Sequence, residues 1–202
     1  QGFDPQTING SILPFLNYET RGIQDTKSYA AFADGVYTLT DSTRLTAGIR
    51  YTIDERDMDG TLIANAGNTV PAGTILFAKK QDDTFKSPSW RLVLDHDLTD
   101  DVLIYGSYNR GFKSGLFNTG EVTQGSVDPE KLDAFEIGLK SELFDRSVRL
   151  NTSAFYYDYK DIQLTKADGN GTQILFNAAT AKLYGLDAEV SYAPALSGGR
   201  LE

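Results

Sequence analysis

The stretch DERDMDGT, residues 54–61, places acidic side chains at alternate positions before a glycine. Carboxylates at this spacing are typical of calcium sites, and the stretch matches the first half of an EF-hand loop. The twelfth position of that loop would be Ala66, where calcium requires a bidentate glutamate, so an EF-hand is excluded. We interpret the stretch as a solvated acidic loop, with a looser calcium site formed by Glu55, Asp57 and Asp59 as the alternative.

A second stretch, YNRGFKSGLFN at residues 108–118, combines hydrogen-bond donors, aromatic rings and two glycines. Cations and amides suit a polar ligand, and phenylalanine rings offer surfaces for stacking. The glycines allow the backbone to bend where a strand passes into a loop. The stretch therefore predicts either a structural bend or a ligand-binding loop, whose contact residues would be Arg110, Phe112, Lys113, Phe117 and Asn118.

Cysteine is absent from the chain, and histidine occurs once, as His96. The lack of cysteine excludes disulfides, zinc–thiolate sites and thiol catalysis. His96 lies between Asp95 and Asp97, but the sequence offers no partners that would complete a metal site or a catalytic triad around it. We therefore expect no catalytic residues, no cofactor and no enzyme activity. A catalytic cluster at His96 remains a hypothesis that His96→Ala would test.

The net charge is −9, from 19 basic and 28 acidic residues. Domains that bind nucleic acid normally carry a basic surface that neutralises phosphate, so we expect no nucleic-acid partner. No apolar run approaches the ~20 residues that a membrane-spanning helix needs.

Period-two alternation of apolar and polar side chains is the dominant pattern and predicts β-strands. The only helical candidate is short, at residues 129–134. The pattern predicts an all-β chain with seven strands between about residues 27 and 193, an eighth starting at Gly199, and a loop at residues 1–26. The expected strands cover residues 28–39, 44–53, 89–96, 102–112, 133–143, 149–161 and 182–192.

Short and long connections between these strands alternate without exception. In an antiparallel up-and-down meander, successive connections lie at opposite ends, so all the short turns share one end. That segregation is typical of transmembrane β-barrels, which have short periplasmic turns and long extracellular loops. Short turns are expected at residues 40–43, 97–101, 144–147 and 194–198, and longer segments at about 54–86, 113–130 and 162–173.

The apolar side of each strand would then meet lipid, and the polar side would line a wet interior. The apolar side includes Ile49, Leu139 and Leu186. Residues 102–112 allow either orientation, because apolar residues occur at both alternating sets of positions. The charged residues expected to face the interior are Arg44, Arg50, Glu136, Lys140, Arg149, Asp187 and Glu189.

Six stretches carry a resemblance to a known family: YAAF (29–32), LTAGIRYT (45–52), YGSYNRGFKSGLFN (105–118), DAFEIGLKSELF (133–144), LNTSAFYYDYKDIQ (150–163) and NAATAKLYGLDAEVSY (177–192). In this order they resemble the barrel of TonB-dependent outer-membrane receptors, the active importers of Gram-negative bacteria. The resemblance spans about residues 27–193. It implies that residues 1–202 are a partial β-barrel domain, about a third of a barrel of roughly 22 strands.

The resemblance also implies a function and partners. Such receptors bind a scarce nutrient, for example a ferric siderophore, cobalamin or a carbohydrate, with extracellular loops and import it by energy-coupled transport. The partners would be outer-membrane lipid, the nutrient ligand, and an energy-transducing periplasmic protein that acts through a plug domain not visible here. The alternative is a small soluble or membrane-anchored β-barrel that holds an apolar ligand, with its apolar side chains turned inward.

Overall fold

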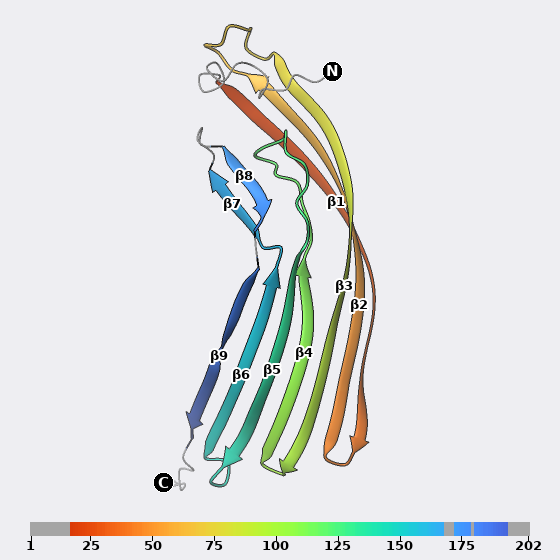
Figure 1. The fold of residues 1–202 in the computed structure, drawn as a ribbon, viewed down its shortest axis with the longest axis vertical. Helices are drawn as coiled ribbons and strands as arrows, with labels where there is room; N and C mark the ends of the chain where they lie inside the picture. The colour runs from red at the N-terminus through yellow and green to blue at the C-terminus, as the bar shows by residue number, and fades with distance from the viewer. Residues whose placement is uncertain (1–16, 168–171, 179, 194–202) are drawn as a thin grey trace, which may run out of the picture.

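The computed structural model describes residues 17–167, 172–178 and 180–193. Seven antiparallel strands form one curved sheet in the order β1-β2-β3-β4-β5-β6-β9, and β7 and β8 form a separate hairpin. Figure 1 shows the short turns at the lower end of the sheet and the long connections at the upper end. The all-β antiparallel meander predicted from the alternation is confirmed. No helix long and apolar enough to cross a membrane occurs among the described residues.

The first three strands are much longer than the others. They are β1 (Tyr18–Thr40), β2 (Thr43–Ala64) and β3 (Ile75–Thr99), whereas β4 (Val102–Lys113), β5 (Glu130–Leu143), β6 (Val148–Lys160) and β9 (Ala181–Tyr192) span 12 to 14 residues. The hairpin consists of β7 (Gln163–Ala167) and β8 (Gln173–Asn177). As Figure 1 shows, β1 to β3 therefore rise above the rest of the sheet.

Four expectations about secondary structure are wrong. Residues 18–26 are the start of β1 rather than a loop, and the predicted loop 54–86 is mostly the upper part of β2 and β3, joined by a turn at 65–74. Residues 129–134 form no helix, because β5 begins at Glu130 and pairs with β4. The segment 162–173 contains β7 instead of a plain loop. The strand expected at Gly199 lies outside the described residues.

The register assigns each side chain to one of two faces, because residues directly opposite each other share a face. We call the face with Ile49, Ile137 and Leu186 the outer face; these three side chains are 61%, 67% and 85% exposed. The face with Arg50 and Glu136 is the inner face. The register also resolves residues 102–112, because Ile104 lies opposite Leu139, which puts it on the outer face.

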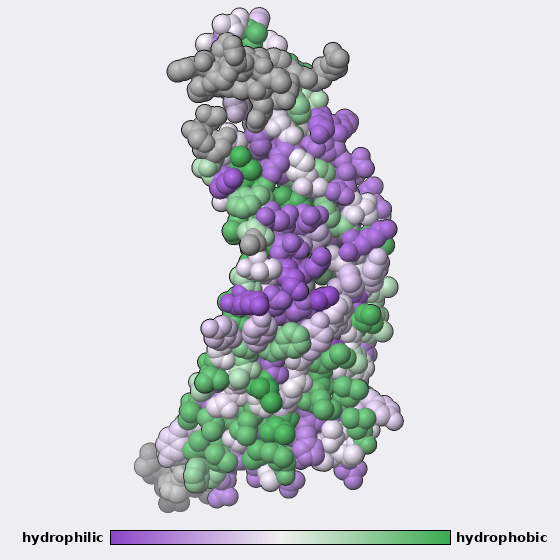
Figure 2. Space-filling model, in the orientation of Figure 1, coloured by the Kyte–Doolittle hydropathy of each residue, from purple (hydrophilic) through white to green (hydrophobic). Residues whose placement is uncertain are grey.

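The apolar part of the outer face has the height of a membrane. Along β6 it extends from Val148, opposite Tyr192, to Tyr156, opposite Tyr184, and the next outer-face pair is the charged Asp158 and Lys182. Eight steps of about 3.3 Å, tilted by about 40°, give a band about 20 Å high, close to the ~25 Å apolar band of outer-membrane barrels. Figure 2 shows hydrophobic residues gathered over the lower part of the sheet and a hydrophilic band across its middle.

The buried core lies in the upper part, on the inner face, and not in the band. Met58, Leu62, Phe117 and Val122 form a cluster with exposed fractions of 6% or less, and Leu76 and Phe77 pack against it. Met58 and Leu62 come from β2, whereas Phe117 and Val122 come from the connection between β4 and β5. This connection therefore folds inward and covers the inner face of the tall strands.

Candidate functional site: the upper rim

The upper rim consists of the tall parts of β1 to β3, the connection between β4 and β5 (residues 114–129) and the β7–β8 hairpin. The connection can lie flat on the sheet because glycines face it. Gly22 and Gly60 are directly opposite in the register, and a Cβ at Gly60 would come within 2.6 Å of the Val122 side chain. A Cβ at Gly22 would come within 2.5 Å of the Thr119 carbonyl oxygen. Both positions require glycine because the two segments approach so closely.

Hydrogen bonds fix the connection to the tall strands. The Phe117 backbone N–H donates to Gln24 Oε1 at 3.0 Å, and Gln81 Nε2 donates to the Gln124 carbonyl oxygen at 3.1 Å. Ser126 Oγ donates to Asp83 Oδ2 at 2.5 Å. These bonds satisfy polar groups beside the small core, where an unpaired group would be costly.

A second set of bonds fixes the same connection to the hairpin. The Gln124 side chain donates from Nε2 to the Leu175 carbonyl oxygen, and its Oε1 accepts from the Leu175 N–H. Asn177 exchanges two bonds with the backbone of Asp128, at 2.8 and 2.9 Å. The connection is thus a bridge between the tall strands and the hairpin.

The Glu130 carboxylate lies at the base of this bridge and is 4% exposed. It accepts bonds from the Gln163 backbone N–H at 2.7 Å, from Tyr159 Oη at 2.9 Å and from Lys113 Nζ at 3.3 Å. Burial by itself raises the pKa of this carboxyl, but the three donors together hold the pKa of Glu130 below its ordinary value. The Tyr159 pKa is raised by the same carboxylate and by burial.

The structure separates the five predicted ligand-binding residues. Arg110 and Phe112 lie on the outer face, opposite Asp133 and Lys131. Lys113 lies on the inner face and pairs with Glu130. The Phe117 ring is buried in the small core, 3% exposed, and its place there is structural.

Asn118 Nδ2 donates to the Gln173 carbonyl oxygen at 2.6 Å and so joins the bridge to the hairpin. Gly111 lies within β4, which continues to Lys113, so the strand does not bend there. Gly115 follows the strand, and a Cβ there would meet the Phe85 ring at 2.3 Å, so this position requires glycine for close packing.

The three calcium candidates do not lie in a loop. Glu55, Asp57 and Asp59 are exposed on the outer face of β2, and Asp57 lies directly opposite Asp25 on β1 and Asp82 on β3. No group of three or more acidic, histidine or cysteine side chains among the described residues could hold a metal ion. His96 accepts or donates one bond, to Thr43 Oγ1 at 2.8 Å, on the outer face.

The inner face below the rim carries many charged and hydrogen-bonded side chains beside apolar ones such as Leu103. Arg91 pairs with Asp34, Arg44 pairs with Asp95 and Asp97, and Tyr105 donates to Glu136. Such a face suits an aqueous passage, since paired charges there remain hydrated. The sequence predicted this charged face but missed Gln124 in the bridge and Glu130 and Gln163 at its base. The one available signal was their position in a long loop, which suggests function.

Comparison with known proteins identifies the family of this chain. The family described as "TonB dependent receptor-like, beta-barrel" matches residues 1–201. The chain belongs to this family. As a TonB-dependent receptor barrel it resides in the outer membrane of Gram-negative bacteria, with its short turns on the periplasmic side and its upper rim outside. The lipid-facing assignment of the outer face is consistent with this location.

Similar proteins include the pesticin receptors of Yersinia enterocolitica (28% identical over 189 residues, covering 91% of this chain and 26% of that protein) and Yersinia pestis (28% identical over 185 residues, covering 89% and 25%). The solved structure of the ferric yersiniabactin uptake receptor FyuA from Yersinia pestis aligns with a TM-score of 0.72 at 24% identity, covering 87% of this chain and 25% of that one.

The ferric-catecholate import receptor Fiu of E. coli aligns with a TM-score of 0.64 at 16% identity. The alignment covers 85% of this chain and 26% of that chain. The chain thus spans about a quarter of the length of these relatives, which are transport receptors rather than enzymes. The alternative of a small barrel with an apolar interior is not supported, because the chain matches the receptor barrel family over residues 1–201.

Proposed function

We propose that this chain forms one wall of a receptor that binds a scarce nutrient at its extracellular mouth and imports it by energy-coupled transport. A ferric siderophore is the favoured nutrient class, ahead of cobalamin or a carbohydrate. The observation that carries the proposal is the combination of a polar inner face with a rim held inward by the bridge. The relatives named as a pesticin receptor and a ferric yersiniabactin uptake receptor support the choice of nutrient.

The inner face offers cations for an anionic ligand. The Arg50 guanidinium lies 5.8 Å from the centre of the Phe32 ring and donates from Nε to Thr52. Among the described residues it has no carboxylate partner within 4.0 Å, unlike Arg91, which pairs with Asp34. A cation that lies beside an aromatic ring and carries no paired acid can attract a ferric complex of negative charge into the passage.

Lys113 and Asn118 are the two predicted ligand contacts that remain on the inner side of the rim, and we retain them in the proposal. The remaining partners are a plug domain and an energy-transducing periplasmic protein, both of which act on the complete receptor. The surrounding partner is outer-membrane lipid, which covers the outer face.

The test uses the full-length receptor in a strain that lacks its own siderophore uptake. Cells with the receptor should accumulate radioactive iron from at least one ferric siderophore, and dissipating the proton gradient should abolish the accumulation. Arg50→Ala should weaken binding of an anionic ferric siderophore by about tenfold, the scale of one charge-assisted contact. The matched control is Lys140→Ala, an inner-face lysine near the periplasmic end. Uptake of no ferric siderophore, with uptake of cobalamin or an oligosaccharide instead, would contradict the nutrient class.

A further inference from the structure

The inner face differs between its two halves. Over β1 to β3 it is charged, as the pair of Arg91 and Asp34 illustrates. Over β4 to β6 aromatic rings lie among the polar side chains. Interiors of outer-membrane barrels are normally polar, so rings on this face require an explanation. We call four of them the aromatic track: Tyr159, Tyr157 and Phe155 on β6, and Tyr105 on β4.

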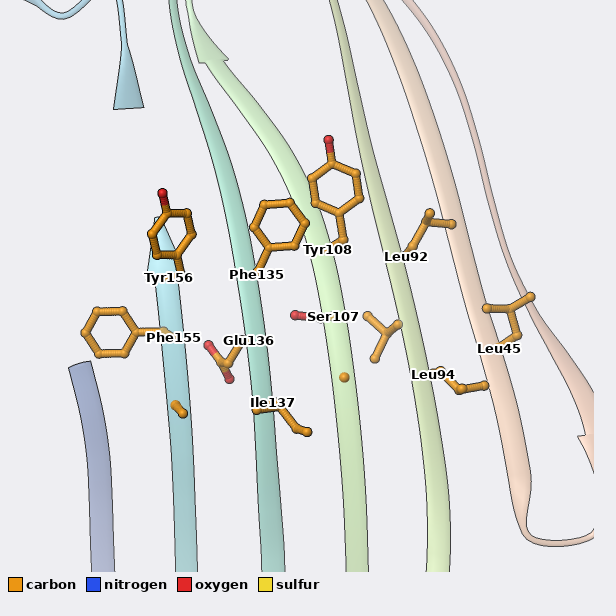
Figure 3. Close-up of a pocket in the computed structure, with 13 residues that line it drawn as sticks. Leu45, Leu92, Leu94, Ser107, Tyr108, Phe135, Glu136, Ile137, Phe155 and Tyr156 are labelled. Carbon is orange, nitrogen blue, oxygen red and sulfur yellow. The ribbon is translucent and has the colours of Figure 1, made fainter. Parts of the chain in front are cut away.

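The aromatic track follows the height of the sheet. Alternate residues of a strand are about 6.6 Å apart, so Tyr159 and Phe155 are separated by about 13 Å along β6. Tyr159 lies at the base of the bridge, where its hydroxyl donates to Glu130 at 2.9 Å. Figure 3 shows Phe155 beside Glu136, its partner in the register on β5. Tyr105 donates to the same Glu136 from a position nearer the periplasmic end. The rings therefore lead from the rim down the wall of the passage.

Packing explains two of these rings. A Cβ at Gly138 would meet the Tyr105 ring at 2.6 Å, and a Cβ at Gly185 would meet the Phe155 ring at 2.9 Å. Tyr105 and Phe155 thus fill gaps that glycines leave in the wall. They give the aromatic track a fixed lower part, and their positions require no ligand.

Tyr157 has no such explanation. Its partners in the register are Ala134 and Leu183, neither of them a glycine. The ring packs against Phe155 with centroids 4.9 Å apart, and the hydroxyl makes no hydrogen bond to any described residue. Leu183 beside it is 52% exposed. A ring, a free hydroxyl and an exposed leucine together form a surface typical of sites for ligands that carry aromatic and polar groups.

Small residues lie beside the upper rings. Ala134 and Ala181 are the register partners of Tyr157 and Tyr159 on β5 and β9, respectively. Gly111 lies on the same face one strand further along, and a Cβ there would meet no heavy atom within 4 Å. The wall beside the rings is therefore low, which leaves space for a flat group to lie against them.

We propose that the aromatic track is the surface along which a ferric siderophore with catecholate or phenolate arms moves from the rim toward the periplasm, with its rings stacking on Tyr157. This inference rests on the proposed function and names the substrate class within it. The rings of such a complex stack on the aromatic track, and its anionic iron centre is attracted by the cations of the charged half, such as Arg50. A trihydroxamate complex has no rings and gains nothing from the track.

The alternative occupant of the aromatic track is the plug domain, and the two occupants predict different results. A ligand that passes the rings during import makes Tyr157 matter for the rate of import of aryl complexes alone. A plug that packs on the rings makes Tyr157 matter for the stability of the receptor without ligand and for the import of every complex.

The test measures import by the full-length receptor in a strain without siderophore uptake of its own. The probes are two synthetic ferric complexes on the same tripodal backbone, one with three catecholate arms and one with three hydroxamate arms, both labelled with radioactive iron. Wild-type cells should import the catecholate complex. Tyr157→Ala should slow that import about fivefold, because one stacking contact is lost along the path. Binding of the catecholate complex to cells without a proton gradient should stay as in wild type, since capture occurs at the rim.

Two further variants serve as controls. Tyr157→Phe keeps the ring and should import the catecholate complex at the wild-type rate; a Phe variant as slow as the Ala variant would assign the effect to the hydroxyl and overturn stacking. Tyr184→Ala removes a ring from the outer face of β9, where it lies opposite Tyr156, and should leave import unchanged. Heat-modifiable mobility on gels checks that each variant is folded.

Other results would also overturn the proposal. If correctly folded Tyr157→Ala imports the catecholate complex at the wild-type rate, the ligand does not use this ring. Equal slowing of both complexes, with a lower melting temperature of the receptor without ligand, would assign the ring to the plug domain. Import of the hydroxamate complex alone, or of neither complex, would exclude the aryl class. The proposed function fails only if no ferric siderophore at all is imported.

Discussion

The lower and upper parts of β2 bury opposite sides of the same strand. In the membrane band the apolar residues are Leu45, Ile49 and Ile53, at odd positions on the outer face. Above the band the buried residues are Met58 and Leu62, at even positions on the inner face. The pleat is continuous, so the change of side reflects a change of solvent: lipid surrounds the lower part and water surrounds the upper part.

This comparison shows that alternation identifies a strand without identifying what its apolar side meets. Below, the apolar side needs no protein partner because hydrocarbon covers it. Above, exposed apolar residues would meet water, so the bridge of residues 114–129 supplies the partner. The largest predicted effects follow from this division.

Phe117→Ala should destabilise the upper part by about 3–5 kcal/mol, because it removes a buried ring from the small core. Membrane insertion should be unchanged, since the ring lies above the band. Hydrogen exchange of the full-length receptor should show faster exchange in the upper parts of β2 and β3 and unchanged exchange in β5 and β6. Faster exchange throughout the barrel would show that the two parts are not independent.

Leu139→Arg should hinder insertion by about 2–4 kcal/mol, because it places a charge on the lipid side near the middle of the band. Ser107→Arg is the matched control: it lies on the inner face of β4, directly opposite Glu136, and should be tolerated. Folding into lipid vesicles at a series of urea concentrations measures both. Similar losses for the two variants would contradict the assignment of the faces.

Glu130→Gln should weaken the base of the bridge by about 1–3 kcal/mol, because the buried site loses a charged acceptor of three bonds. The wild-type pKa is lowered in the folded state. The stabilisation is therefore complete above the ordinary value of 4.5 and is lost as the pH falls from there through the folded pKa. Protease sensitivity of the upper rim between pH 6 and pH 3 should rise in wild type and be flatter in the variant.

Asp57→Asn should stabilise the tall strands slightly, by a few tenths of a kcal/mol, because it removes the central charge from a row of three opposed aspartates. The difference should shrink in high salt, which screens exposed charges. Added calcium should not change wild-type stability. A calcium-dependent stabilisation of wild type that is absent in Asp57→Asn would instead revive the looser calcium site.

Much of the lower part was predictable from sequence. Strict alternation around Ile49, Leu139 and Leu186 gave both the strands and their faces, because lipid on one side and water on the other impose opposite preferences at every step. The faces of residues 102–112 could not be predicted from sequence, since Leu103 and Tyr105 are apolar residues on the side that faces water. Only pairing with β3 and β5 assigns them.

The upper part was harder to predict for a physical reason. Glu55, Asp57 and Asp59 resemble a loop in water because their side of the strand is charged. On the other side, the small residues Gly60 and Ala64 interrupt the large apolar residues, so the period-two pattern of a strand is difficult to recognise. The buried side could be recognised only with its covering segment, which is distant in sequence. Ligand contacts depend on the same long-range packing. The residues expected to act together, such as Arg110 and Lys113, therefore lie on opposite faces.

The height of β1 to β3 has a practical consequence. From Ile53 to Ala64 the strand continues for eleven residues beyond the band, which places the turn at 65–74 on the order of 30 Å above the bilayer. A fluorophore or an epitope tag introduced in that turn would lie well outside the bilayer and could be reached on living cells. It would offer a way to count and follow these receptors without touching the passage or the lipid-facing wall.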